Sequence, residues 1–404
     1  MPHTRSVSMF ISVGAGSRYE PSELAGLSHF LEHLPFKGTR SWPTALAISE
    51  AVEGVGGIMN AATDREMTSF WCKVASVYAD RALPVIIDLV RHPLLDPTEM
   101  EKERDVILDE LRMTNDYPAE VCALLIDRAI WPGQAMGRDV GGEPKTVSAI
   151  GLEDVRQYME RQYRPNNTVI SIAGALDHDT AVGMLAEATA DWMPGEPLGW
   201  EPVVAAADDA PTILLDTRPA EDTNLCIGMP GLMMTDPDRY AATVLNGVLG
   251  DGMSSRLFQN LRENLGITYD VHSALSNYRD CGALVVSCGT EPARAAEAVQ
   301  ATRTELLGML ERVPDTEVHK VREYIKGRLL MRMEDSRAVA AWLSSQELLL
   351  GEITTPDETA SRIDAVTPTD VLRTAERLIS PQAFRLAVVG PHENDTEFRA
   401  ALSG

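Results

Sequence analysis

The two halves of this 404-residue chain repeat each other in sequence. Residues 153–174 resemble residues 369–390 at a constant offset of 216, and residues 98–102 resemble residues 316–320 at an offset of 218. Self-similarity at one spacing indicates that a structural unit has been duplicated. We therefore expect two copies of one fold, which also agrees with a chain longer than a single hydrophobic core usually supports.

Each half is predicted to combine strands with amphipathic helices. In the first half, alternation of apolar and polar residues predicts a strand at 6–13, a hairpin over 59–74 and a strand at 168–173. Helical periodicity and capping signals predict helices at 45–55, 81–91, 99–114 and 151–163. A stretch rich in Pro, Gly, Ala and Asp follows, so the predicted division is a first domain at 1–195, a linker at 196–211 and a second domain at 212–404.

The charge and the cysteines disfavour several classes of protein. With 60 acidic and 36 basic residues, the formal net charge of −24 disfavours nucleic acid and anionic membranes as partners. The five cysteines are an odd number without a Cys-x-x-Cys pair, which fits a reducing compartment. The sequence shows neither a leader pattern nor an apolar run of about 18 residues. We therefore expect a cytoplasmic protein that binds no membrane and no nucleic acid.

The clearest chemical signal is the segment His29-Phe30-Leu31-Glu32-His33. Apolar residues at three- and four-residue spacing predict a helix here, opened by capping signals at residues 21–23. His29 and His33 are one helical turn apart, so both imidazoles face the same side and can bind one metal ion. Glu32 is placed to reach a water molecule on that ion. The order His-x-x-Glu-His is the inverted zincin signature; the alternative is a pair of surface histidines on an exposed helix.

A zinc ion held by two histidines needs a third protein ligand and an open position for water. The predicted helix at 99–114 carries Glu103 and Glu110, which are two turns apart and share one face. One of this pair is the natural third ligand, and the other would orient and charge the site. Without the histidines, either residue would be an ordinary solvated glutamate.

The second half has no corresponding metal site. At the offset of 218, Glu103 aligns with Val321 and Glu110 aligns with Arg328. The region equivalent to the first helix, residues 241–250, contains no histidine. The sequence therefore predicts one metal site per chain.

These motifs resemble the pitrilysin and insulysin family of zinc metallopeptidases. They are most similar to its short-chain branch, which includes the mitochondrial processing peptidase and bacterial peptidases with two-domain subunits. The resemblance covers nearly the whole chain, and its most specific parts are the His-x-x-Glu-His motif and residues 36–39 and 103–110. It implies an α+β fold of two homologous domains, each a mainly antiparallel sheet flanked by helices.

The resemblance also implies a role for each residue of the motifs. The zinc ligands are His29, His33 and Glu110, with one Zn²⁺ per chain. Glu32 acts as the general base and then as the general acid, and Glu103 is the supporting glutamate of the catalytic site.

Two further stretches match segments that contact the substrate. Residues 57–68 are similar to the edge strand along which an extended peptide pairs by β-augmentation. The implied contacts there are Asn60, Ala61 and Thr63. In the second half, Arg262 and Tyr269 match an arginine and a tyrosine that reach the substrate near the zinc, and Tyr269 is implied to stabilise the oxyanion.

The implied function is that of a zinc-dependent endopeptidase that hydrolyses extended peptides or precursor segments inside a closed chamber. Because this chain carries both the zinc motif and the Arg-Tyr pair, a homodimer is expected, with a heterodimer with a related subunit as the second arrangement. The alternatives are a non-catalytic structural or partner subunit of the same fold, and an enzyme dedicated to one precursor peptide. Chains of the family usually begin with an extra strand before residue 6, so we expect either a mis-assigned start codon or a sheet with a bare edge.

Overall fold

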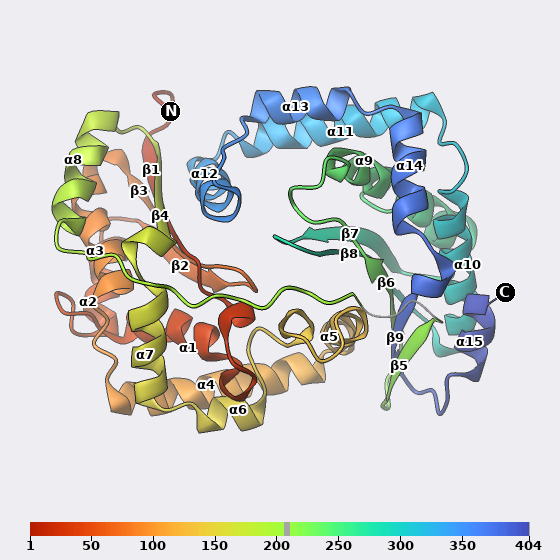
Figure 1. Ribbon diagram of the computed structural model, residues 1–404, viewed down its shortest axis with the longest axis horizontal. Helices are drawn as coiled ribbons and strands as arrows, with labels where there is room; N and C mark the ends of the chain where they lie inside the picture. Colours follow the sequence, from red (N-terminus) through yellow and green to blue (C-terminus); the bar gives the residue numbers. More distant parts are fainter. Residues whose placement is uncertain (206–210, 404) are drawn as a thin grey trace. The chain divides into compact units, whose positions relative to one another are not determined.

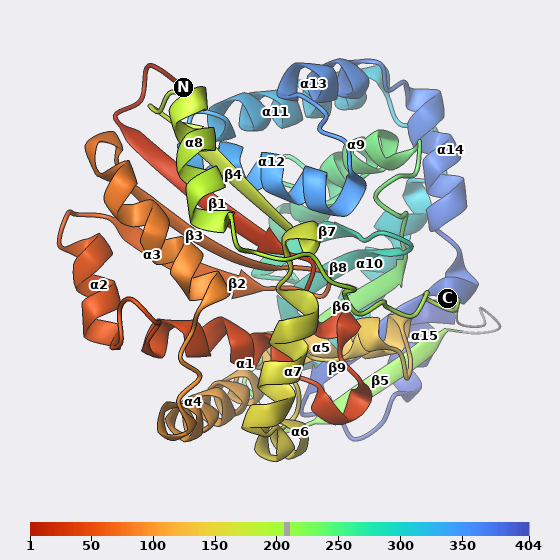
Figure 2. The same ribbon diagram turned by 60° about the vertical axis from the view of Figure 1, so that its left-hand side comes forward.

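The computed structural model describes residues 1–205 and 211–403, which form two compact units (Figures 1 and 2). The first unit comprises residues 1–112, 138–201 and 330–354. The second comprises residues 113–137, 202–329 and 355–404, apart from the residues that are not described. Each unit contains one sheet flanked by helices, which confirms the predicted α+β class.

The sheet of the first unit is antiparallel, with the strand order β2-β3-β1-β4. Its strands are β1 (Ser6–Val13), β2 (Ile58–Thr63), β3 (Thr68–Ala75) and β4 (Thr168–Gly174). The predicted hairpin and the two predicted strands are confirmed. Among the described strands, β4 pairs with β1 alone and β2 pairs with β3 alone, so both lie at edges of this sheet.

The helices of the first unit lie on both faces of its sheet. In chain order they are α1 (Leu27–His33), α2 (Ala45–Glu53), α3 (Ala79–Arg91), most of α4 (Pro97–Asp116), α6 (Pro144–Ala149), α7 (Leu152–Gln162), α8 (His178–Thr189) and α12 (Ser336–Leu350). In Figure 1, α3 lies on one face of the sheet and α12 on the other. The helices predicted at 45–55, 81–91, 99–114 and 151–163 are confirmed within a few residues at their ends.

The sheet of the second unit has the order β5-β9-β6-β8-β7. Its strands are β5 (Thr212–Thr217), β6 (Thr223–Pro230), β7 (Asp270–Asn277), β8 (Gly282–Thr290) and β9 (Arg385–Gly390). Only the pair of β5 and β9 is parallel. The helices are α5 (Pro118–Ile130), α9 (Arg239–Leu249), α10 (Ala295–Gly308), most of α11 (Asp315–Arg332), α13 (Pro356–Asp364), α14 (Pro368–Leu378) and α15 (Thr396–Ser403).

The internal repeat is visible as repeated structure. Residues 153–174 form most of α7 and all of β4, and residues 369–390 form most of α14 and all of β9, with a short 3₁₀ turn between helix and strand in both copies. The matched stretches 98–102 and 316–320 lie near the starts of α4 and α11. The two halves of the chain are therefore homologous in secondary structure, as their sequences predict.

Each unit contains one helix from the opposite half of the chain. Helix α5 follows α4 in sequence, yet it packs on β9 and β6 of the second unit. Its counterpart α12 follows α11, yet it packs on β1 and β4 of the first unit. The predicted domains, 1–195 and 212–404, divide the chain at a single linker, whereas each compact unit consists of three separate stretches.

Small side chains allow α12 to lie close to β1. Ser336 and Ser344 are eight residues apart on the helix, about 12 Å along its axis, and Ser8 and Ser12 are about 13 Å apart along the strand. The two pairs therefore meet in register, with Oγ–Oγ distances of 2.9 Å for Ser8 and Ser336 and 2.8 Å for Ser12 and Ser344. All four hydroxyl groups are buried and partnered in this way, and the opposite face of β1 carries the apolar core residues.

No helix among the described residues has the length and apolar character that crossing a bilayer requires. All five cysteines lie in the described part of the chain, and all five are free thiols.

The packing of α12 on β1 provides a test of the fold. We expect Ser344→Leu to lower the free energy of unfolding by about 1–3 kcal/mol, because the larger side chain overfills a close contact and leaves the Ser12 hydroxyl without its partner. Glu347→Leu on the exposed side of the same helix should change it by less than about 0.5 kcal/mol. Denaturant unfolding of both variants measures the difference, and equal midpoints would contradict the packing described here.

Candidate metal centre

Helix α1 places its two histidines on the face that does not enter the core. Leu27, Phe30 and Leu31 are fully buried, whereas His29 and His33 are partly exposed. The imidazole rings meet edge to face across one turn, with centroids 4.8 Å apart and planes at 78°. The predicted clustering of these two side chains is therefore observed.

The start of α1 is fixed by a buried carboxylate. Gly26, just before the helix, has a left-handed backbone with φ of 99°. The carboxylate of Glu20 accepts hydrogen bonds from the backbone N–H groups of Gly26 at 2.8 Å and Ser28 at 2.6 Å. These bonds satisfy N–H groups that have no partner within the helix, and they hold the turn immediately before His29.

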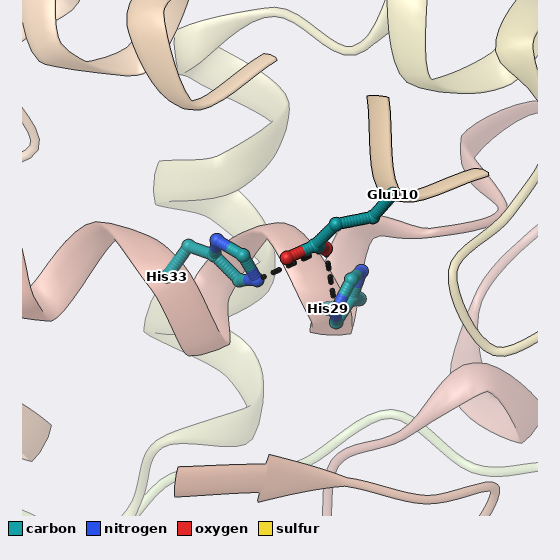
Figure 3. Close-up of side chains that lie close together, drawn as sticks. All are labelled: His29, His33 and Glu110. Atoms are coloured by element: carbon teal, nitrogen blue, oxygen red, sulfur yellow. Dashed lines mark ion pairs between the residues drawn. The ribbon is translucent and has the colours of Figure 1, made fainter. Parts of the chain in front are cut away.

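Helix α4 supplies the third side chain of the cluster. The Glu110 Oε2 atom lies 3.7 Å from His29 Nε2 and 3.6 Å from His33 Nε2 (Figure 3). One potential ligand atom from each of the three residues lies within 4.8 Å of the others. Of the two glutamates left open by the pattern of residues, Glu110 is the one that faces both histidines.

The cluster has the composition and spacing of a zinc site. Two imidazoles and one carboxylate are a common donor set of catalytic zinc, with the fourth position open for water. Zinc bonds of about 2.0–2.2 Å in tetrahedral geometry place ligand atoms roughly 3.3–3.6 Å apart. The separations of Glu110 Oε2 from the two Nε2 atoms, 3.6 and 3.7 Å, are close to this range, and all three potential ligand atoms lie within 4.8 Å of one another, so the donor set fits a zinc ion.

The electrostatic environment keeps His29 in the form that binds metals. Burial lowers the pKa of His29, and the nearby His33 lowers it further, while Glu32 and Glu110 act in the opposite direction. A lowered pKa means that the imidazole is neutral at neutral pH and can offer a lone pair. Its Nδ1 atom is buried and has no hydrogen-bond partner among the described residues, and Nε2 is the nitrogen that faces Glu110.

Glu103 supports the second histidine. Its side chain is 6% exposed, and its Oε2 atom lies 3.1 Å from Nδ1 of His33. Because a carboxylate can only accept, Nδ1 of His33 is the donor, and the lone pair is on Nε2, which faces Glu110. A carboxylate behind a metal-binding histidine fixes both the tautomer and the orientation of the ring.

Glu32 lies on α1 between the two histidines in sequence and is half-buried. Its charge raises the pKa of His29, against the lowering caused by burial and by His33. This position agrees with a group that exchanges a proton with a nearby water molecule.

The edge strand β2 lies beside the helix that carries the histidines. Thr63 donates a hydrogen bond of 3.5 Å to the backbone carbonyl of Ser28 in α1. The side chain of Asn60 is exposed, and its Oδ1 accepts from the backbone N–H of Ala61 at 2.8 Å. Since β2 pairs only with β3 among the described strands, its other side carries backbone groups without a strand partner.

Arg262 and Tyr269 lie next to each other in the second unit. Arg262 is in the helical segment Phe258–Asn264, and Tyr269 immediately precedes β7. The guanidinium carbon of Arg262 lies 5.3 Å from the centre of the Tyr269 ring and 4.8 Å from that of Phe258. Tyr269 is 84% exposed, so its phenol is open to a ligand.

The counterpart of Glu110 in the second half has a different partner. The guanidinium Nη1 of Arg328 lies 3.2 Å from Asp251 Oδ1 and 2.6 Å from the hydroxyl of Tyr324. Within residues 1–205 and 211–403, His29, His33 and Glu110 form the one cluster of three metal-binding side chains at such short distances. The expectation that the second half lacks metal ligands stays a prediction.

Two supporting residues were not assigned from the sequence. Lys37 contacts Glu103, and its position four residues after His33, one helical turn, was a signal that could have placed it on the same face. Glu20 precedes α1 by several residues in a loop without a periodic pattern, and no sequence signal identifies its role.

Comparison with known proteins gives a consistent result over both halves. Residues 1–143 match the family model described as insulinase (peptidase family M16), and residues 149–325 match the model described as the peptidase M16 inactive domain. An uncharacterized zinc protease of Streptomyces coelicolor is 35% identical over 402 residues, covering 97% of this chain and 86% of that protein. An uncharacterized zinc protease of Bacillus subtilis is 33% identical, covering 97% of this chain and 95% of that protein.

Solved structures show the same fold at lower identity. A protease from Helicobacter pylori superimposes with a TM-score of 0.90 at 18% identity, covering 96% of this chain and 95% of that chain. A protein from Pseudomonas fluorescens, described as a peptidase M16 inactive domain, superimposes with a TM-score of 0.89 at 17% identity, covering 96% and 94%. Together with the zinc proteases of similar sequence, these matches show that the chain belongs to the M16 family of peptidases, the insulinase family.

Proposed function

We propose that this chain is a zinc-dependent endopeptidase with one zinc ion per chain, bound by His29, His33 and Glu110. The observation that carries the proposal is the approach of Glu110 to both Nε2 atoms, at 3.6 and 3.7 Å, with Glu103 behind His33. When bound, zinc supplies Lewis acidity to a water molecule and to the scissile carbonyl group.

Glu32 and Glu103 have separate roles beside the metal ion. The carboxylate of Glu32 accepts a proton from the attacking water and delivers it to the leaving amine nitrogen. The proton therefore passes from the water to the carboxylate of Glu32 and from there to the amine nitrogen. Glu103 holds Nδ1 of His33 throughout, so that the ring does not turn away from the metal.

The substrate is an extended peptide that pairs with the edge strand β2. Main-chain hydrogen bonds along an edge strand bind peptides with little dependence on sequence, which suits the cleavage of peptides or precursor segments. Asn60, Ala61 and Thr63 of β2 are the proposed contacts. Arg262 and Tyr269 contact the same peptide in this proposal, and Tyr269 stabilises the oxyanion through its exposed phenol.

The proposed assembly rests on the residues that one chain contains. Because the histidine motif and the Arg-Tyr pair occur in the same chain, we propose a cytoplasmic homodimer that encloses the peptide, with a heterodimer with a related subunit as the second arrangement. A non-catalytic subunit remains the rival function, and the next experiment separates it from an active enzyme.

Metal content and chelator sensitivity test the proposal directly. We expect elemental analysis of the purified protein to find about one zinc per chain, since the described residues contain one cluster of three side chains that could bind it. A chelator should abolish cleavage of a quenched fluorescent peptide library, and added zinc should restore it. Zinc without cleavage would favour the non-catalytic subunit, and the absence of zinc would contradict the metal site itself.

Two substitutions separate proton transfer from metal binding. We expect Glu32→Gln to keep its zinc and to lower kcat by about 10²–10⁴-fold, because the proton acceptor is removed while the ligands remain. His33→Ala should lose both zinc and activity, because one ligand is missing. Elemental analysis and peptide cleavage measure both effects, with Glu53→Gln on the exposed side of α2 as the control. Normal turnover in Glu32→Gln would rule out its assignment as the base.

A third substitution tests the second unit. We expect Tyr269→Phe to lower kcat by roughly 10–100-fold with unchanged zinc content, because one hydrogen bond to the oxyanion is lost. The matched control is Tyr324→Phe, which removes a hydroxyl bonded to Arg328 in the same unit. If the two variants cleave peptides at the same rate as the unaltered protein, Tyr269 does not take part in the reaction.

A further inference from the structure

Lys37 forms a charged contact behind the metal-binding face. It ends the short 3₁₀ helix Leu34–Lys37 that continues α1 beyond His33. Its Nζ atom lies 2.5 Å from Oε1 of Glu103, and the other oxygen of that carboxylate, Oε2, accepts from Nδ1 of His33 at 3.1 Å. One carboxylate thus joins a lysine and a histidine of the same polypeptide segment.

The burial of Glu103 explains why the lysine matters. A carboxylate that is only 6% exposed is costly without an opposite charge, and within residues 1–205 and 211–403 Lys37 is the one permanent cation that forms an ion pair with Glu103. With one oxygen bound to Lys37 and the other bound to His33, the carboxylate is fixed at both ends. Without Lys37, the carboxylate would be held only by its hydrogen bond with His33 and would be less firmly oriented.

The two histidines differ in how they are held. His33 is oriented through Glu103, whereas Nδ1 of His29 is buried without a hydrogen-bond partner among the described residues. The orientation of the three metal-binding side chains therefore depends strongly on the hydrogen bond between His33 and Glu103. If the side chain of Glu103 becomes less ordered, the imidazole of His33, whose Nε2 faces Glu110, also becomes less ordered.

We propose that Lys37 is a positioning residue of the metal centre, which acts on His33 through Glu103. This inference rests on the proposed zinc site and adds the residue that fixes its supporting carboxylate. The expected consequence is a weaker affinity for zinc when the ammonium group is removed, in the range of about 10–100-fold that is typical for partners of metal ligands.

The surroundings of Lys37 allow the substitution without disturbing the core. Its side chain is 30% exposed and lines an open surface pocket of about 420 Å³ together with Leu94, Asp96 and Glu99. Lys37→Met keeps an unbranched apolar side chain of similar length and removes the ammonium group, with its charge and its hydrogen-bond donors. Lys102→Met is the matched control, because Lys102 pairs with Glu99 at 2.6 Å on the surface of the same helix as Glu103.

The test measures the dissociation constant for zinc by competition with a chromogenic chelator, and the visible absorption of the cobalt-substituted protein as a reporter of ligand geometry. We expect Lys37→Met to bind zinc about tenfold more weakly and to change the cobalt spectrum, and Lys37→Arg to restore both. Lys102→Met should match the unaltered protein. Circular dichroism of each variant verifies that it is folded.

A double substitution shows whether the effect passes through Glu103. In a Glu103→Ala background, Lys37→Met should weaken zinc binding no further, because the carboxylate through which Lys37 acts on His33 is already absent. Unchanged affinity in Lys37→Met, or a full additional loss in the double variant, would overturn the proposal. If the unaltered protein itself binds no zinc, the proposed function fails instead, which keeps the two outcomes distinct.

Discussion

The hydrogen bond between buried Glu103 and His33 connects the two helices on which the candidate metal centre depends. Helix α1 provides His29 and His33, and helix α4 provides Glu103 and Glu110. The cluster therefore forms only when these two helices are held in a fixed position relative to each other. The same carboxylate is neutralised by Lys37, and the start of α1 is held by buried Glu20. Because Glu20 and Glu103 are buried, each of these carboxylates needs a partner, and leaving one unpaired would lower the stability of the fold.

The two copies of the fold place different side chains at the position of Glu110. The first copy places Glu110 against two imidazoles, whereas the second copy places Arg328 at the equivalent position, bonded to Asp251 and Tyr324. A guanidinium cannot share a site with a metal cation, since both are positively charged. The second copy instead presents Arg262 beside an exposed Tyr269, which suits contact with a ligand.

The sequence predicted the elements of the fold well because each element is determined locally. The strand pattern of β1, the hairpin of β2 and β3, and the helical periods of α4 and α7 all appear within a few residues of the expected bounds. The packing of α5 and α12 on the sheets of the opposite halves was not predictable in this way. Small residues such as Ser336 and Ser344 mark a close contact, but they do not say which sheet they meet.

By itself, the sequence determined the family, the α+β class, the duplication and the two histidines on one helical turn, since spacing along a helix dictates a shared face. The pattern of residues left Glu103 and Glu110 as candidates for a third zinc ligand, and the family resemblance implied Glu110. Only the tertiary structure decided that Glu110 faces both imidazoles, that Glu103 lies behind His33 with Lys37, and that each sheet takes a helix from the opposite half. These facts depend on the packing of segments distant along the chain, and local patterns of residues carry no information about such distances.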